Sequence, residues 1–212
     1  MPEFDLCVVT RPAPRPGAPG HLEIARAALE GGARLIQLRD KEAEGGELFA
    51  LGQELRLLAR QYQALLIIND RADIAQAVGA KGVHLGQLDL PVSAARRLLG
   101  PEAVIGASVA TVQEAKRAEA DGASYVSVGA IFPSGSKADA GEAIGLGPIG
   151  EIKRNVELSV LAIGGISRDN VEAVVRAGAD GVAVSSAVAD APNMTAATAE
   201  LLRAIRVARS SC

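Results

Sequence analysis

Aromatic residues and cysteines are scarce in this sequence. It has two tyrosines, three phenylalanines and no tryptophan, although apolar residues make up 49% of its 212 residues. The core must therefore be built from Ala, Val, Leu and Ile, which suits helices packed over a buried parallel sheet. The two cysteines, Cys7 in an apolar run and Cys212 at the end, form neither a disulfide framework nor a metal-ligand spacing. A reducing cytoplasm is therefore the expected location.

Other absences exclude whole classes of protein. The chain has 22 basic and 25 acidic residues and a net charge of −3, so no basic surface indicates a nucleic-acid partner. No apolar run approaches the ~20 residues of a membrane span. The opening MPEFDLCVVT lacks the basic region of a signal peptide. We expect one domain over residues 1–212 with neither a nucleic-acid nor a membrane partner, and the sequence leaves homo-oligomerisation open.

A short phrase recurs along the chain, in which a helix exit rich in small residues precedes an apolar strand. It reads GGARLIQL at 31–38, VGAKGVHL at 78–85, DGASYVSV at 121–128 and AGADGVAV at 177–184. Further strand candidates alternate with these at 5–10, 64–70, 103–108 and 159–165, and stretches of helical period include 48–62, 111–120, 170–178 and 195–210. These alternating units predict a single (β/α)8 TIM barrel. An open doubly wound sheet is disfavoured because no G-x-G-x-x-G follows the first strand.

Polar residues follow nearly every predicted strand. In a barrel these positions share one face, which holds the active site. They are Arg39, Asp40 and Lys41 after the second strand, Asn69 and Asp70 after the third, Gln87 and Asp89 after the fourth, Ser108 at the end of the fifth, Ser134, Ser136 and Lys137 after the sixth, Gly164 and Gly165 after the seventh, and Ser185 and Ser186 after the eighth. Any one of them is explained by a solvated loop, but together they favour a site for phosphorylated ligands.

The second strand carries the sharpest clue. Because successive side chains of a strand point to opposite faces, Leu35, Gln37 and Arg39 share one face. The opposite face is expected to pack against helices. Gln37 and Arg39 then point into the barrel. A buried arginine needs an anion or a carboxylate, so it indicates either a bound phosphate or a structural ion pair. Lys41 extends the positive charge towards the open end.

Asp70 and Asp89 follow neighbouring parallel strands, so their carboxylates are positioned to share one cation. Two carboxylates completed by phosphate oxygens and water are a typical Mg²⁺ site. The alternative is that each caps the helix that follows it. The nearby positive charges favour the metal, because a polyphosphate brings charge that a divalent ion neutralises.

Two loops have the composition of anion sites. GAIFPSGSKADA at 129–140 contains Ser134, Ser136 and Lys137 on a flexible backbone, which suits a polyphosphate. LAIGGI at 161–166 and AVSSAV at 183–188 fit the phosphate cradle of barrels, with tight glycine packing as the alternative.

The two histidines give no sign of a nucleophile–base pair. His84 lies within a strand, where a packed and hydrogen-bonded ring is expected. His21 lies at a helix start and is expected at the surface.

These motifs resemble the thiamine phosphate synthase family almost from end to end. The resemblance rests on QLRDK (37–41), IINDRADIA (67–75), GVHLGQLDLP (82–91), IGAS (105–108), GAIFPSGSKADA (129–140), AIGGI (162–166) and DGVAVSSAV (180–188). It implies that a thiazole phosphate attacks the methylene of hydroxymethylpyrimidine pyrophosphate, with loss of pyrophosphate and with Mg²⁺ as cofactor.

The resemblance also implies roles for residues. Gln37, Arg39, Lys41 and Asn69 would hold the pyrimidine pyrophosphate, Asp70 and Asp89 would hold Mg²⁺, Ser108, Ser134, Ser136 and Lys137 would take the departing pyrophosphate, and Gly165, Ser185 and Ser186 would bind the thiazole phosphate. Lys137, Arg39 and Ser108 would be catalytic.

Two alternatives remain. A related thiazole tautomerase uses a histidine at about the position of Ala110, and a non-catalytic barrel that binds phosphorylated ligands would need no metal pair.

Overall fold

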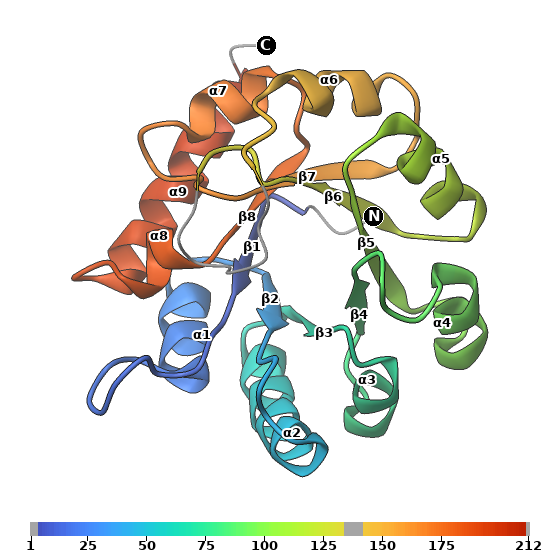
Figure 1. Ribbon diagram of the computed structural model, residues 1–212. Helices are drawn as coiled ribbons and strands as arrows, with labels where there is room; N and C mark the ends of the chain where they lie inside the picture. The colour runs from blue at the N-terminus through green and yellow to red at the C-terminus, as the bar shows by residue number, and fades with distance from the viewer. Residues whose placement is uncertain (1–3, 134–141, 211–212) are drawn as a thin grey trace.

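Eight parallel strands close into a barrel in the order of the chain (Figure 1). The computed structural model describes residues 4–133 and 142–210. The strands are β1 Leu6–Val9, β2 Leu35–Leu38, β3 Leu65–Asn69, β4 Gly82–Leu85, β5 Val104–Val109, β6 Tyr125–Val128, β7 Ser159–Ile163 and β8 Gly181–Val184. The barrel closes where β1 pairs with β8, with Cys7 opposite Ala183. The predicted (β/α)8 barrel is confirmed.

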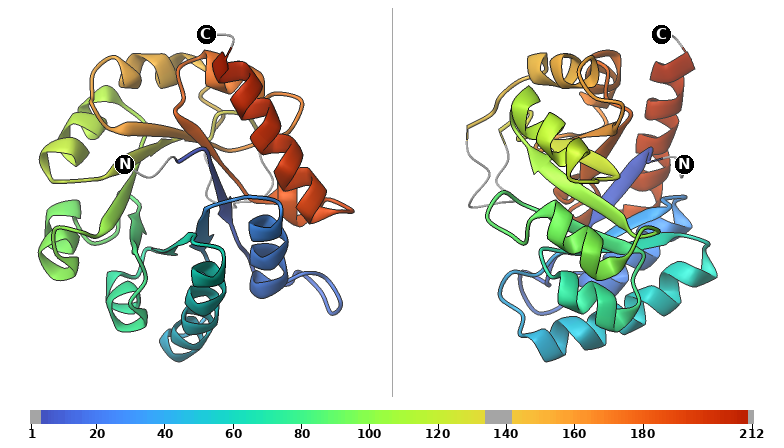
Figure 2. Two further views of the ribbon diagram at one scale, coloured as in Figure 1. Left: turned by 180° about the vertical axis from the view of Figure 1, so that it is seen from behind. Right: turned by 90° about the vertical axis from the view of Figure 1, so that its right-hand side faces the viewer.

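Helices cover the outside of the barrel. Those in the described residues are α1 His21–Glu30, α2 Gly45–Gln61, α3 Ala72–Val78, α4 Val92–Leu99, α5 Val112–Ala120, α6 Gly147–Lys153, α7 Val171–Arg176, α8 Ser186–Ala189 and α9 Met194–Ser210. Figure 2 shows α9 lying across the outer wall, where it contacts α1 and α7. None of the helices in the described ranges is long and apolar enough to cross a membrane.

Apolar side chains form two separate layers. The larger cluster fills the space between the strands and the helices and includes Ile36 and Leu38. The smaller cluster fills the barrel interior and includes Cys7, Leu35 and Tyr125. The alternation predicted for β2 is therefore confirmed, because Leu35 faces inward and Ile36 and Leu38 face the helices.

The interior cluster contains two aromatic side chains, Phe4 and Tyr125. Tyr125 is the largest fully buried side chain. Its ring packs against Phe4, with ring centroids 5.2 Å apart. Cys7, Leu161 and Ala183 of this interior cluster border the cavity at the end where the strands finish.

Candidate active site

One cavity of about 310 Å³ opens at the carboxyl ends of the strands. Every predicted site residue that the structure describes lines it. These residues are Gln37, Arg39, Lys41, Asn69, Asp70, Asp89, Ser108, Gly165, Ser185 and Ser186. Ser134, Ser136 and Lys137 lie outside the described residues. The fold thus gathers groups from all the predicted strand ends that can be described.

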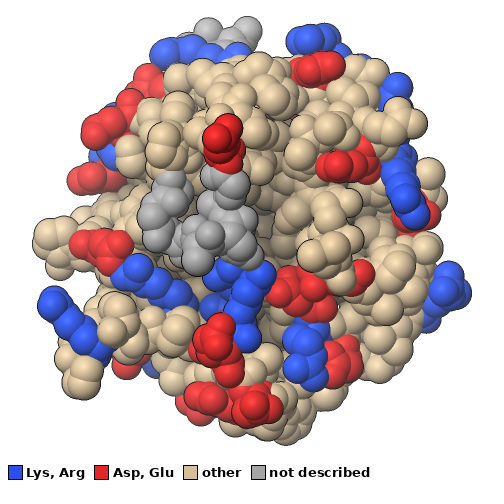
Figure 3. Space-filling view, viewed as in Figure 1, with Lys and Arg blue, Asp and Glu red and all other residues tan. Residues whose placement is uncertain are grey.

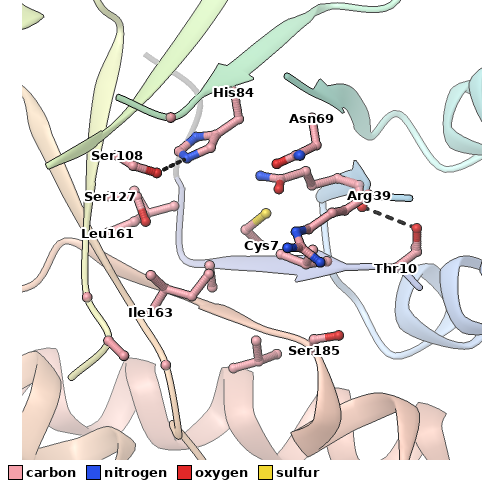
Figure 4. Close-up of a pocket in the computed structure, with 18 of the residues that line it drawn as sticks. Cys7, Thr10, Arg39, Asn69, His84, Ser108, Ser127, Leu161, Ile163 and Ser185 are labelled. Atoms are coloured by element: carbon pink, nitrogen blue, oxygen red, sulfur yellow. Dashed lines mark hydrogen bonds between the residues drawn. The ribbon is translucent and has the colours of Figure 1, made fainter. Parts of the chain in front are cut away.

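Basic and acidic side chains lie side by side around the hollow of this face (Figure 3). Figure 4 shows the side chains of Arg39, Asn69 and His84 reaching into the same space from neighbouring strands. Gln37 is only 5% exposed, as expected for an inward side chain at the end of β2. A cavity with such convergent polar groups is typical of a small-molecule site.

The carboxyl groups of Asp70 and Asp89 meet at the cavity wall. Burial, a hydrogen bond to Asp89 and the charge of Asp89 raise the pKa of Asp70 to about 6, while the charges of Lys41 and Arg39 oppose this rise. Asp89 also accepts a hydrogen bond from the backbone N–H of Gly86 at 2.6 Å. Two carboxylates that repel each other this closely make a ready position for a cation.

The helix-cap alternative for these two residues is wrong. The N-cap of α3 is Arg71 and that of α4 is Pro91, and neither cap side chain accepts a hydrogen bond from its helix. Asp70 instead has a φ of +63°, in the left-handed region that few residues other than glycine adopt. Its N–H donates to the carbonyl of His84 at 2.8 Å, which fixes this turn at the end of β3. Such strain is commonly kept at functional sites.

Glycines after β7 pack tightly, and they also border the cavity. Gly165 has a φ of +62°, and a Cβ there would lie 2.6 Å from the carbonyl oxygen of Pro133. Gly164 is equally confined, since a Cβ would lie 2.6 Å from Cα of Ala130. The tight glycine packing given above as an alternative is therefore present. It does not exclude an anion site, because the backbone of this turn also lies at the edge of the cavity.

Ser185 and Ser186 stand at the start of α8, on the same side of the cavity as β8. Ser185 is the N-cap residue of this short helix, and its carbonyl accepts hydrogen bonds from Val188 and Ala189. The first N–H groups of a helix have no acceptor within the helix. The serine hydroxyls and these N–H groups can together bind an anion.

The prediction that His21 lies at the surface is wrong. His21 is 6% exposed, and its ring bridges the loops after β1 and β2. Nδ1 lies 2.8 Å from the hydroxyl of Thr10, and Nε2 lies 3.2 Å from Oδ2 of Asp40. Burial lowers the pKa of His21 more than Asp40 raises it. The ring is therefore a neutral brace for the loop that carries Arg39 and Lys41.

A signal for this burial is present in the sequence. The buried residues of α1 are His21, Ile24, Ala25, Ala28 and Leu29, which recur at steps of three and four. His21 thus begins the apolar stripe of its own helix. Extending the stripe by one turn predicts a buried ring.

His84 is buried and hydrogen-bonded, as predicted, but its partners lie at the cavity. Nδ1 lies 3.0 Å from the hydroxyl of Tyr125, and Nε2 lies 3.0 Å from Oγ of Ser108. The His84 and Tyr125 rings are stacked, with centroids 5.6 Å apart. Sequence reasoning missed Tyr125, because its hydroxyl meets a residue two strands away.

Cys7, Thr10 and Arg11 also line the cavity, and sequence reasoning did not place them there. Burial raises the pKa of the Cys7 thiol to about 12, so the thiol is not a nucleophile at neutral pH. Arg11 pairs with Asp190, just beyond α8. Alternation along β1 places Cys7 and Val9 inward, whereas Thr10 and Arg11 follow the end of the strand.

Comparison with known proteins agrees with this site. The family model described as thiamine monophosphate synthase matches residues 6–188. The chain belongs to this family.

Two relatives named as thiamine-phosphate synthases resemble the chain over most of its length. The thiamine-phosphate synthase of Moorella thermoacetica is 49% identical over 209 residues, which cover 99% of both chains. That of Methanospirillum hungatei is 51% identical over 193 residues, covering 91% of this chain and 93% of the relative.

A solved structure of the family has the same fold. The thiamine phosphate pyrophosphorylase of Pyrococcus furiosus superposes with a TM-score of 0.87 at 41% identity, covering 97% of each chain. This member of the thiamine monophosphate synthase family is therefore an enzyme with the barrel that the family shares.

Proposed function

We propose that this enzyme joins hydroxymethylpyrimidine pyrophosphate to 4-methyl-5-hydroxyethylthiazole phosphate, giving thiamine phosphate and pyrophosphate. The thiazole nitrogen forms a bond to the methylene carbon of the pyrimidine, and the bond from that carbon to the pyrophosphate oxygen breaks with its electron pair. The observation that carries the proposal is the convergence of the predicted phosphate, metal and pyrimidine groups on one cavity.

The basic residues after β2 would hold the pyrophosphate of the first substrate. Arg39 and Lys41 are close enough to Asp70 for their charges to oppose the rise in its pKa. A pyrophosphate between these cations and the acidic pair would gain charge-assisted hydrogen bonds. Gln37 and Asn69, which line the wall beside them, would hold the pyrimidine by its polar edge. Ser134, Ser136 and Lys137 would take the leaving group from the loop after β6.

The donor set of the acidic pair fits Mg²⁺. The described residues include no group of three or more His, Cys, Asp or Glu side chains around one point, so Asp70 and Asp89 would bind the ion with water and phosphate oxygens. Bound there, Mg²⁺ would neutralise charge on the pyrophosphate. The repulsion that raises the pKa of Asp70 is the property that a divalent cation would relieve.

The second substrate would bind by its phosphate at the opposite wall. Ser185 and Ser186 offer two hydroxyls and the start of α8, and the backbone at Gly165 lies beside them at the cavity edge. One phosphate would then lie at the ends of β7 and β8, and the other at the ends of β2 to β6. The two reacting groups would then meet over the interior, above Tyr125.

The chemistry needs little acid–base assistance. The aminopyrimidine can stabilise positive charge on its methylene, so pyrophosphate can leave before the thiazole nitrogen attacks. That nitrogen has no proton to lose. The protein therefore has to stabilise charge on the leaving group, which preorganised donors such as Arg39 and Ser108 do well.

The direct test supplies both phosphorylated substrates and measures thiamine phosphate. We expect product only when both substrates are present. Chelation of Mg²⁺ should abolish product formation, and adding Mg²⁺ back should restore it. Isomerisation of the thiazole without coupling would instead identify a tautomerase. That alternative relies on a histidine near position 110, where this chain has an exposed alanine that does not line the cavity. Tight binding of both compounds without any turnover would indicate a non-catalytic barrel.

Location in a reducing cytoplasm stays a prediction, and homo-oligomerisation stays open. Fractionation of cells tests the location, and light scattering of the purified protein tests the oligomeric state.

A further inference from the structure

Three inward positions on adjacent strands place His84, Gly106 and Tyr125 in one row. Gly106 of β5 pairs with His84 of β4 on one side and with Tyr125 of β6 on the other. A Cβ on Gly106 would lie 2.2 Å from Cζ of Tyr125 and 2.4 Å from Nδ1 of His84. The missing side chain therefore makes the space in which the histidine ring meets the tyrosine hydroxyl.

Ser108 stands two residues beyond Gly106 on the same strand, and so on the same inward face, one step nearer the open end. Its Oγ lies 3.0 Å from Nε2 of His84 (Figure 4). The result is a chain of hydrogen bonds that starts at Tyr125 in the barrel interior, passes through both nitrogens of His84 and ends at a hydroxyl on the cavity wall.

The direction of this chain follows from its buried end. Tyr125 is 1% exposed, and among the described residues its hydroxyl has one hydrogen-bond partner, Nδ1 of His84. Burial raises the pKa of Tyr125 well above its usual value, so the phenol keeps its proton. That proton needs an acceptor, because a buried donor without one is costly. Nδ1 of His84 must then accept, and the ring proton must sit on Nε2.

We propose that Tyr125 and His84 are positioning residues that orient the hydroxyl of Ser108 as a donor into the cavity. With the proton on Nε2, His84 donates to Oγ of Ser108, and the serine proton turns to the cavity. Resting on the proposed function, this makes Ser108 a fixed donor to the departing pyrophosphate. A serine free to rotate would supply this hydrogen bond only part of the time, whereas a preorganised donor needs no reorientation during the reaction.

The position of the ring proton can be measured without any turnover. The chain has only two histidines, so nitrogen-15 NMR of the full-length protein labelled at histidine gives two rings, and His21→Gln identifies the signals of His84. At neutral pH we expect the proton of His84 on Nε2 and an unprotonated Nδ1. In Tyr125→Phe the preference for Nε2 should be lost. A proton on Nδ1 in the native protein, or an unchanged ring in Tyr125→Phe, overturns the proposal.

Matched substitutions at His84 provide the kinetic test. The amide nitrogen of a glutamine side chain can occupy the place of Nε2. The side chain of asparagine is shorter, and its amide nitrogen does not reach Ser108. We expect His84→Asn to lower kcat on the order of tenfold to a hundredfold, as supporting partners of a site residue do, with the KM for the thiazole phosphate unchanged. His84→Gln should recover most of that loss. Equal kcat values in the two variants contradict the proposal.

The two readouts separate this inference from the proposed function. A protein that forms no thiamine phosphate but carries its His84 proton on Nε2 refutes the function and keeps the hydrogen-bond direction. A protein that forms thiamine phosphate with the proton on Nδ1 refutes the direction alone.

Discussion

Asp70 and Asp89 face each other beyond the ends of β3 and β4, where burial, a hydrogen bond to Asp89 and the charge of Asp89 raise the pKa of Asp70 to about 6. A hydrogen bond between two carboxyl groups requires one of them to hold a proton. Above the pKa of Asp70, the charge on this carboxylate is repelled by the charge of Asp89. The protein without metal is therefore strained at the point where the proposed Mg²⁺ binds.

Asp89→Asn should stabilise the metal-free protein at pH 7.5 and abolish its response to metal. Asparagine keeps an oxygen for the N–H of Gly86 and removes the repulsion on Asp70. Each 1 kcal/mol gained raises the melting temperature by roughly 2–4 °C in a chain of this size. A raised acid pKa costs stability in full above that pKa and not at all below the pKa of the unfolded chain, so the gain should disappear as the pH falls from 6 towards 4. Mg²⁺ added with pyrophosphate should raise the melting temperature of the native protein but not that of the variant. An equal rise in both proteins would show that Asp89 is not part of the metal site.

Lys137→Ala should reduce turnover by about a hundredfold or more, as loss of a group that stabilises a leaving anion does. Its melting temperature should stay that of the native protein. Lys116→Ala, which changes an exposed lysine of α5, is the matched control and should keep native kinetics. Activity of Lys137→Ala near that of the control would take Lys137 out of the leaving-group site.

Ser186→Ala should mainly weaken binding of the thiazole phosphate. The hydroxyl is proposed to donate to a charged oxygen, and such a hydrogen bond is worth about 1.5–3 kcal/mol, or roughly a 10- to 100-fold rise in KM. The KM for the pyrimidine pyrophosphate should not change. Ser210→Ala at the end of α9 serves as control, since Ser210 is exposed and its hydroxyl donates to the carbonyl of Arg206 in its own helix. An unchanged KM for the thiazole phosphate in Ser186→Ala would exclude this contact.

His21→Gln should change how stability depends on pH. Burial lowers the pKa of His21 in the folded state. Below about pH 6.5 the histidine is therefore protonated more readily in the unfolded chain than in the folded one. The native protein therefore loses stability as the pH falls through this range, and the variant lacks this loss. The difference in unfolding free energy between the two should narrow by at most about 1.4 kcal/mol per pH unit below 6.5. Urea titrations at pH 7.5 and 5.5 measure it, and a constant difference would mean that His21 titrates normally.

Gly106→Ala should destabilise the fold by about 1–3 kcal/mol or more, as overpacking of a core does. Its new methyl would clash with Tyr125 and His84, and both rings would have to move. Gly147→Ala is the matched control, because no atom lies within 4 Å of a Cβ at that position. If Gly106→Ala has the same melting temperature as the control, the row of His84, Gly106 and Tyr125 is not tightly packed.

Local patterns in the sequence were sufficient for the barrel and for much of the site. The recurring exits and apolar runs mark strand ends, and parallel strands that close a barrel must present those ends on one face. Gln37 and Arg39 could be assigned to the interior because side chains alternate along a strand. The pairing of Asp70 with Asp89 followed from the order of the strands, since β3 and β4 are neighbours.

The tertiary structure alone decided which groups touch across the barrel. Asp70 and Asp89 had helix-capping as an equally local explanation, which was excluded because the helices that follow them have Arg71 and Pro91 as their N-caps. His21 meets Asp40, and Tyr125 meets His84, over separations of 19 and 41 residues, for which no local period exists. The sequence by itself determined the periodic features: the eight strands, their inward faces and the polar residues at their ends. Hydrogen-bond partners depend on strand register and on the space that a residue such as Gly106 leaves open, and these arise only when the barrel closes.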